Sequence, residues 1–271
     1  MIRSIEEHSL NAWPALQTNL QDGWLLRFAA GYTRRANSVN PLYPCLGDPL
    51  ENISACEALY RARGLPVIFK ITPASQPAGL DELLAARGYR LEAPTSVQLL
   101  SLAQTAHAPL NPSNPLHSVH PVHPVHPVNS EDPVLSVAPI TITPTLADAW
   151  LAAYSRISAA EPAREAIHRQ LLQSILAGCA YAALSLDGQI VSVGLGILQG
   201  GLIGLYDIAT HPASRRQGHA SRVIHSLLAW GRAGGAGHAY LQVMLNNPPA
   251  LQLYANLGFR ELYQYHFRVK A

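Results

Sequence analysis

The sequence predicts a mixed α/β protein of the α+β type, built from two halves that each hold a mostly antiparallel sheet flanked by helices. Strand-like and helix-like apolar periodicities occur on both sides of a proline-rich stretch. The run Leu-Leu-Ala-Ala-Arg-Gly-Tyr-Arg at 83–90 also resembles Leu-Tyr-Ala-Asn-Leu-Gly-Phe-Arg at 253–260. Both runs close a helix with glycine before a strand, which favours two related halves. We expect a first domain over 1–105, a linker over 106–138 and a second domain over 139–271.

The composition excludes several classes of protein. The chain has 271 residues, of which 48% are hydrophobic, so it is not fully disordered. Its net charge of +2 does not predict nucleic-acid or membrane binding. The three cysteines, Cys45, Cys56 and Cys179, form neither a disulfide framework nor a metal-binding knuckle. The start has no apolar stretch of signal-peptide length, so we expect a cytoplasmic protein.

The uncharged stretch 188–206 is long enough to be mistaken for a membrane span. It holds six glycines and is interrupted by Gln199-Gly200-Gly201. This pattern predicts two buried strands joined by a tight turn instead.

The predicted linker is rich in proline and histidine. Eight of the 21 prolines and five of the 12 histidines lie between 103 and 139, and His-Pro-Val occurs three times from His120 to Val128. Proline at every third position favours an extended polyproline II path. A three-residue spacing then places the imidazoles about 9 Å apart, too far for one ion. A linker is therefore the main interpretation, and a metal-binding tether that folds back on itself is the alternative.

The second half has the clearer pattern of elements. We expect strands at 140–143, 181–186, 189–198, 202–210, 239–245 and 261–269. We expect helices at 146–157, 163–176 (with Pro162 at the first position), 216–232 and 249–257. The pattern is an antiparallel meander followed by a β-α-β unit.

The first half is less regular. A hairpin is expected around Gly31, from strands at 24–29 and 32–39. A helix capped by Asp48-Pro49 should run to 63, followed by a strand at 67–71, a helix at 80–87 and a strand at 95–102.

One motif of the second half predicts an anion-binding site. Arg215-Arg216-Gln217-Gly218-His219-Ala220 follows an apolar strand and opens a helix. The first N–H groups of a helix have no partner within it, and the helix dipole adds positive potential there. The glycine would let a phosphate approach the backbone, and the arginines would add charge-assisted hydrogen bonds. The alternative is a glycine-containing helix start with surface arginines.

A second motif follows the next strand. Asn247-Pro248-Pro249-Ala250-Leu251-Gln252-Leu253-Tyr254 leads into Leu257-Gly258-Phe259. Together the two motifs resemble those of the GNAT superfamily of acetyl-CoA-dependent N-acetyltransferases. The family's loop R/Q-x-x-G-x-G/A is met from Arg215 to Ala220, and its signature N-x-x-A-x-x-L-Y-x-x-x-G-F is met from Asn247 to Phe259. The resemblance covers 139–271 and implies a GNAT-like fold.

The resemblance also implies roles for individual residues. The strand before the loop would bind the pantetheine arm, the N–H groups from Gln217 to Ser221 would hold the pyrophosphate, and Asn247 would lie near the thiol. Tyr254 would protonate the departing thiolate as a general acid, since an O–H donor stabilises that charge. The implied acetyl-CoA contacts are Ile208, Ala209, Thr210, Arg215, Arg216, Gln217, Gly218, His219, Ala220, Ser221 and Asn247.

The general base is less clear. Many family members carry a glutamate on the strand before the loop, but Gly204 stands four residues before Ile208. Tyr206 shares strand parity with Ile208, and Asp207 points to the other side unless a bulge shifts it. Asp207 and Tyr206 are the candidates, with a water chain or a backbone carbonyl as alternatives.

The first half resembles a degraded relative of the second. Aligning Gly88 on Gly258 places Leu84 at the position of Tyr254 and Pro77 at that of Asn247, and no phosphate loop precedes 67–71. We therefore expect this half to shape the acceptor pocket. Its basic run at 33–38 lies in a strand-like stretch and could meet an acidic acceptor, or could be a solvated strand edge.

These features predict an N-acetyltransferase that moves an acetyl group from acetyl-CoA to a primary amine of a small molecule or peptide. The amine would attack directly in a ternary complex. We expect no metal and no nucleic-acid or membrane partner, and a homodimer is one expected assembly. The alternatives are an aminoacyl or peptidyl transferase on paired halves and a non-catalytic acyl-CoA-binding regulator.

Overall fold

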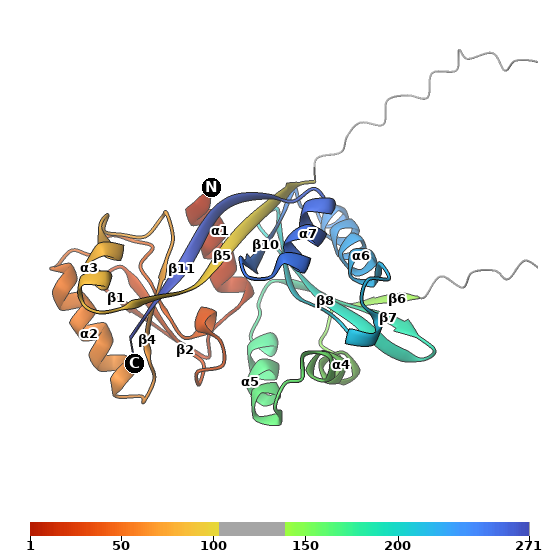
Figure 1. The fold of residues 1–271 in the computed structure, drawn as a ribbon, viewed down its shortest axis with the longest axis horizontal. Helices are drawn as coiled ribbons and strands as arrows, with labels where there is room; N and C mark the ends of the chain where they lie inside the picture. The colour runs from red at the N-terminus through yellow and green to blue at the C-terminus, as the bar shows by residue number, and fades with distance from the viewer. Residues whose placement is uncertain (103–138, 271) are drawn as a thin grey trace, which may run out of the picture.

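The computed structural model of the chain describes residues 1–102 and 139–270 (Figure 1). The predicted linker (106–138) and its His-Pro-Val repeats lie outside the described residues. The first half (1–102) contains α1 (Ile2–Ala12), β1 (Gln17–Gln21), β2 (Trp24–Phe28), β3 (Val39–Asn40), α2 (Pro49–Arg61), β4 (Val67–Ile71), α3 (Leu80–Ala86) and β5 (Arg90–Ser101). The second half (139–270) contains β6 (Ile140–Thr143), α4 (Asp148–Ser158), α5 (Pro162–Gln173), β7 (Gly178–Leu186), β8 (Gln189–Gln199), β9 (Leu202–Thr210), α6 (His219–Ala233), β10 (His238–Met244), α7 (Pro248–Asn256) and β11 (Arg260–Lys270).

The elements predicted for the second half are confirmed, with ends that differ by a few residues. Proline occupies the start of α5, and the uncharged stretch becomes β8 and β9, joined through Gly200 and Gly201. Among the described residues, no helix has the length and apolar character that a membrane crossing requires. No cluster of three His, Cys, Asp or Glu side chains suited to a metal ion occurs in the described part either.

The hairpin predicted around Gly31 is confirmed only in part, because β2 does pair antiparallel with β3, but β3 is limited to Val39–Asn40. Strand β2 pairs with the preceding β1, and the turn between them is Asp22-Gly23, where both residues have positive φ (41° and 81°). Strand β1 was missed because it is a polar, largely exposed edge strand. The stretch 32–39 is not a strand: it contains a 3₁₀ helix at Arg34–Ala36 and reaches β3 only at Val39.

All strands of the described residues form one eleven-stranded sheet, in the order β1-β2-β3-β4-β11-β5-β10-β9-β8-β7-β6. Each half inserts its last strand into the other: β5 lies between β10 and β11, and β11 lies between β4 and β5. The two long strands therefore run side by side across the middle of the molecule (Figure 1). This exchange joins the halves through backbone hydrogen bonds.

The order of elements repeats in the two halves. The series β3-α2-β4-α3-β5 corresponds to β9-α6-β10-α7-β11, and the pairs β3–β4 and β9–β10 are both parallel. Gly88 and Gly258, both at positive φ (83° and 90°), follow α3 and α7. The similarity between 83–90 and 253–260 predicts two related halves, and the fold has this arrangement.

Three apolar clusters pack on the sheet. One lies under α6 and α7, and another lies under α2 and α3 of the first half. The third spans both halves, because Ile5 and Trp13 near α1 pack in the same cluster as Leu151 of α4 and Phe267 of β11. The site described next lies where this shared cluster meets the open end of β9.

Candidate active site

The parallel strands β9 and β10 separate at one end of the sheet. They pair from Leu202 opposite His238 to Leu205 opposite Leu241, and the matched register ends there. Beyond this point β9 continues to Thr210 and β10 to Met244. Two diverging strands leave backbone groups available to a ligand that enters between them.

A β-bulge alters the direction of the side chains on β9. The register with β8 shifts between Ala209 and Tyr206, and Asp207 has a positive φ of 50°. Tyr206 consequently packs in the cluster shared by both halves, and Ile208 packs on the α6 side. The shared parity of Tyr206 and Ile208 that the sequence suggests is therefore wrong, because the extra residue breaks the alternation.

Helix α6 begins without a side-chain cap. Its N-cap is Gly218 at φ 78°, and a Cβ built there would meet no atom within 4 Å. Arg216 also has positive φ (60°), and the Arg215 Nε donates to the Thr210 carbonyl at 3.2 Å. The first N–H groups of the helix thus face open space beside two guanidinium groups, an arrangement that attracts anions.

A cavity of about 670 Å³ joins this helix start to β9 and α7. Its walls include every predicted acetyl-CoA contact except Gln217, whose side chain donates to the Ala213 carbonyl. His219 at the start of α6 is only 8% exposed, and neither ring nitrogen has a hydrogen-bond partner among the described residues. The structure therefore brings residues from 208–221 and 247–254 together around one space.

Tyr254 lines the same cavity. Its side chain is 9% exposed, its ring packs edge-on against Phe259, and its hydroxyl makes no hydrogen bond to a described residue. Burial raises the pKa of Tyr254 to about 12. Asn247 is the N-cap of α7, and its Oδ1 accepts from the Ala250 N–H at 3.3 Å. Its amide NH₂ is the group left to meet a ligand.

Asp207 is buried in a group of ionisable and aromatic side chains. Its Oδ2 lies 2.8 Å from the His168 Nε2, and the two side chains are 5% and 1% exposed. The charge of Asp207, with burial, raises the pKa of Tyr154, whose ring lies 4.8 Å from that of His168. Sequence reasoning missed His168, because the predicted helix over 163–176 gives no sign of which strand it covers.

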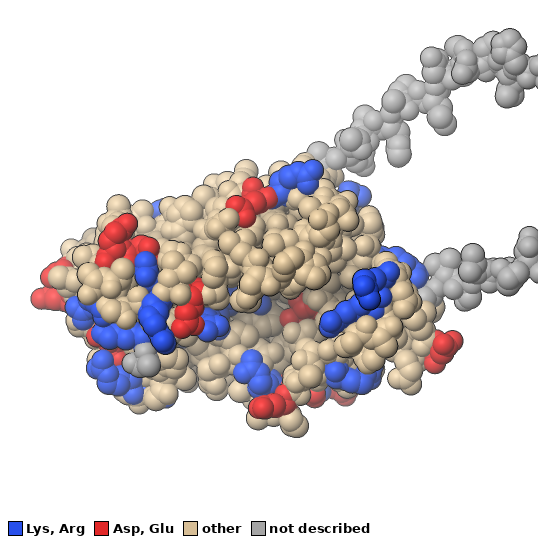
Figure 2. All heavy atoms as spheres, viewed as in Figure 1, with Lys and Arg blue, Asp and Glu red and all other residues tan. Residues whose placement is uncertain are grey.

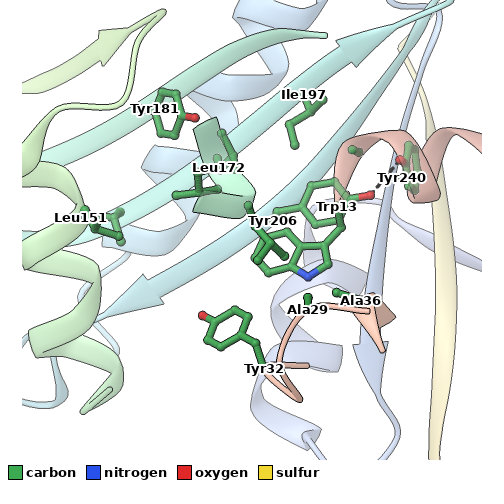
Figure 3. Close-up of a cluster of buried hydrophobic side chains, with 14 of the residues drawn as sticks. Trp13, Ala29, Tyr32, Ala36, Leu151, Leu172, Tyr181, Ile197, Tyr206 and Tyr240 are labelled. Atoms are coloured by element: carbon green, nitrogen blue, oxygen red, sulfur yellow. Dashed lines mark hydrogen bonds between the residues drawn. The ribbon is translucent and has the colours of Figure 1, made fainter. Parts of the chain in front are cut away.

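Tyr206 occupies a different position. Its hydroxyl pairs with that of Tyr240 at 2.9 Å, and its ring stacks on Trp13 with centroids 6.0 Å apart (Figure 3). The side chain is 4% exposed and does not line the 670 Å³ cavity. The structure therefore places the predicted alternative base in the shared core behind the diverging strands.

A second cavity, of about 610 Å³, lies between the two halves, and we call it the inter-half hollow. Tyr32, Arg35 and other residues of the loop 31–37 line it from the first half. Arg164 in the first turn of α5 and Met244 at the open end of β10 line the hollow from the second half. The surface is visibly hollowed where the halves meet (Figure 2). The first half therefore supplies one wall of a pocket that reaches the diverging strands.

Comparisons with known proteins agree with this geometry. Residues 144–259 match the family model "Acetyltransferase (GNAT) family", and residues 1–87 match "Probable histone acetyltransferase Rv0428c C-terminal". The chain is 26% identical over 270 residues to the uncharacterized N-acetyltransferase YobR of Bacillus subtilis strain 168, a match that covers 99% of this chain and 98% of that protein.

Two solved structures share the fold over almost the whole chain. A GCN5-related N-acetyltransferase from Kribbella flavida aligns with a TM-score of 0.62 and 15% identity, covering 99% of this chain and 94% of that one. A tandem GNAT protein from the clavulanic acid biosynthesis pathway aligns with a TM-score of 0.64 and 13% identity, covering 98% and 87%. The chain therefore carries a GNAT acetyltransferase domain at 144–259, with an Rv0428c-like domain before it.

Proposed function

We propose that this enzyme transfers an acetyl group from acetyl-CoA to a primary amine by direct attack within a ternary complex. The observation that carries the proposal is the 670 Å³ cavity, which combines an uncapped helix start, the open end of β9 and the Tyr254 hydroxyl. The helix start would bind the donor's pyrophosphate, the open end of β9 its extended arm, and the Tyr254 hydroxyl would lie near its thioester.

The residues at the start of α6 fit the phosphate end of such a donor. The N–H groups that follow Gly218 would bind the pyrophosphate, and Arg215 and Arg216 would balance its charge. His219 offers an additional ring nitrogen, since both of its nitrogens lack a partner among the described residues. Ile208, Ala209 and Thr210 line the cavity where the arm would bind, beside the open end of β9.

Two groups near the diverging strands can move protons. A hydroxyl with a pKa of about 12 keeps its proton at neutral pH, so Tyr254 can donate it to a departing thiolate. The Asp207 carboxylate, hydrogen-bonded to His168, would accept the proton of the amine. Acetyl-CoA supplies the thioester carbonyl that the amine attacks.

The cysteines support direct attack over an acetyl-cysteine intermediate. None of the three lines the 670 Å³ cavity or the inter-half hollow. Burial raises the pKa of all three thiols, that of Cys56 to about 12, which disfavours the nucleophilic thiolate.

Initial-velocity kinetics with a thiol-release assay test the proposal. Varying acetyl-CoA and an amine together should give intersecting double-reciprocal plots, and the variant C45A/C179A should keep wild-type turnover. Parallel plots, or an acetylated protein isolated before the amine is added, would show a covalent intermediate. Failure of acetyl-CoA to bind would remove the proposed donor.

A further inference from the structure

The inter-half hollow carries unbalanced positive charge. Arg34, Arg35 and Arg164 line it, and no Asp or Glu does so among the described residues. Arg34 is neutralised by Glu92, with the Nη2 and Oε2 atoms 2.5 Å apart. Arg35 and Arg164 form no ion pair with a described carboxylate, so two positive charges face the hollow.

Arg35 lies in a cationic environment. Its guanidinium is 5.0 Å from the centre of the Trp13 ring and 5.7 Å from that of Tyr206, and its side chain makes no hydrogen bond to a described residue. A small adjoining cavity is lined by Arg35 together with Arg27 and Lys70, which are 3% and 4% exposed. Glu6, which binds Lys70, is the carboxylate of this group. Arg27 donates to three backbone carbonyls and Lys70 pairs with Glu6, so Arg35 is the cation of this group that can meet an anion in the hollow.

The negatively charged Asp207 is connected through His168 to Tyr32, a residue that lines the hollow. The Tyr32 ring stacks over His168, the partner of Asp207, with centroids 5.6 Å apart. The Arg164 guanidinium lies 4.8 Å from the centre of the same ring and donates to the Tyr32 carbonyl at 2.7 Å. Burial and the charge of Asp207 raise the pKa of Tyr32 to about 12, and Arg164 and Arg35 act in the opposite direction. The Tyr32 side chain is therefore close enough to Asp207 and to Arg164 for both charges to affect its pKa.

We propose that the acceptor is a small amine that also carries a carboxylate, an amino acid or a close analogue, and this inference rests on the proposed function. Its carboxylate lies against Arg35 and Arg164, and its amine lies on the Tyr32 side of the hollow, next to the His168–Asp207 pair. The apolar residues Ile68, Phe267 and Val269 of the wall favour an apolar side chain. Polyamines and lysine-rich peptides are repelled by the same charges.

The chemistry of the step balances without a further reactant. The amine nitrogen forms a bond to the acetyl carbon, and the carbon–sulfur bond breaks. The proton lost by the nitrogen passes to Asp207, and the departing thiolate receives the Tyr254 proton. The products are an N-acetyl amino acid and the free thiol.

Matched acceptors test this substrate class. After a screen of the amino acids, the best one is compared with its carboxamide and its decarboxylated amine in the thiol-release assay, with kcat/KM expressed per unprotonated amine. We expect the acid to exceed both by about 10- to 100-fold, the range of a charge-assisted contact to carboxylate. Amides or polyamines that react as well as the acid in the wild-type enzyme would overturn the inference and leave the proposed function intact.

Adjacent arginines provide matched variants. Arg35→Gln should reduce the acid-to-amide ratio severalfold, with Arg164 left to hold the carboxylate, and Arg34→Gln should retain most of the ratio, because Glu92 already neutralises Arg34. Equal losses in both variants would contradict the assignment. If Arg35→Gln does not fold, Arg35→Lys replaces it and should keep part of the ratio, since it retains charge without the planar fork.

Two further measurements separate the remaining outcomes. An aminoalkyl phosphate acetylated faster than the matching aminoalkyl carboxylate would replace carboxylate by phosphate and overturn the inference as stated. If no amine is acetylated, the proposed function fails, and calorimetry decides the inference. Binding of the amino acid but not its amide, weakened in Arg35→Gln, would support the site, and equal or absent binding would refute it.

Discussion

Helices α2 and α6 occupy equivalent places in the two halves, yet they begin in opposite ways. Helix α2 is capped by the carboxylate of Asp48, which accepts from the Leu50 N–H at 2.9 Å. Helix α6 is preceded by Gly218, offers no side-chain cap and has two arginines before it. The same topology is therefore closed to anions in the first half and open to them in the second. The loop before a helix, rather than the fold, decides whether the helix start can bind phosphate.

The last helices of the two halves, α3 and α7, also differ: the first half has a closed core where the second half has an open cavity. Leu84 of α3 is fully buried in the first-half core, whereas Tyr254 of α7 lines the 670 Å³ cavity with a hydroxyl that makes no hydrogen bond to a described residue. The first half keeps the scaffold and contributes the loop 31–37 to the inter-half hollow. In the proposed function, donor binding and chemistry belong to the second half, and acceptor binding belongs to the boundary between the halves.

The largest expected effect is on turnover, and it comes from a substitution at Tyr254, for which the equivalent position Leu84 provides the control. Tyr254→Phe keeps the packed ring and removes the proton donor, so turnover should fall about 10²- to 10⁴-fold with little change in acetyl-CoA affinity. With a pKa near 12, the hydroxyl stays protonated, and the deficit should be constant from about pH 7 to pH 10.

Leu84→Met is the matched change in the first half. It should leave kinetics at the wild-type level and cost less than about 1.5 kcal/mol of unfolding free energy. Wild-type turnover in Tyr254→Phe, when chemistry limits the rate, would show that the proton comes from elsewhere.

A smaller effect, on the free energy of unfolding, is expected from a contact that joins the two halves. Asp81 of α3 makes a two-point contact with Arg268 of β11, at 2.7 and 2.9 Å, and also pairs with His266. The hydrogen bonds from Arg268 and His266 lower the pKa of Asp81 to about 2. Because the folded-state pKa is below the ordinary value of 3.8, the contact stabilises the fold above about pH 4. This contribution is lost as the pH falls through about 2.

Denaturant unfolding of Asp81→Asn measures this contact. The variant should lose about 1–2 kcal/mol at pH 6, after allowance for partial exposure, and the difference should shrink below pH 4. Asp148→Asn removes an exposed ion pair with Arg169 inside the second half and should change stability by less than about 0.5 kcal/mol. A difference for Asp81→Asn that does not depend on pH would contradict the ionic origin.

Local signals account for what the sequence could predict. The elements of the second half, the helix start at Gly218 and the position of Tyr254 follow from periodicity and from motifs within a few residues of each other. The exchange of β5 and β11 depends on contacts between residues about 160 to 180 positions apart in the chain, which no local pattern encodes. The bulge at Asp207 and its pairing with His168 depend equally on tertiary packing. The polar strand β1 lacked the apolar alternation on which strand prediction depends.

Calorimetric titration of acetyl-CoA tests most directly that only the helix start of the second half binds the donor. Gly218→Val places a branched side chain over the exposed N–H groups. Gly235→Val, at the opposite end of the same helix, has a similar positive φ (88°) and equally open surroundings, so it controls for backbone strain. We predict one site per chain, lost in folded Gly218→Val and retained in Gly235→Val and Asp48→Ala. Two sites per chain, or wild-type affinity in folded Gly218→Val, would contradict the assignment of donor binding to α6.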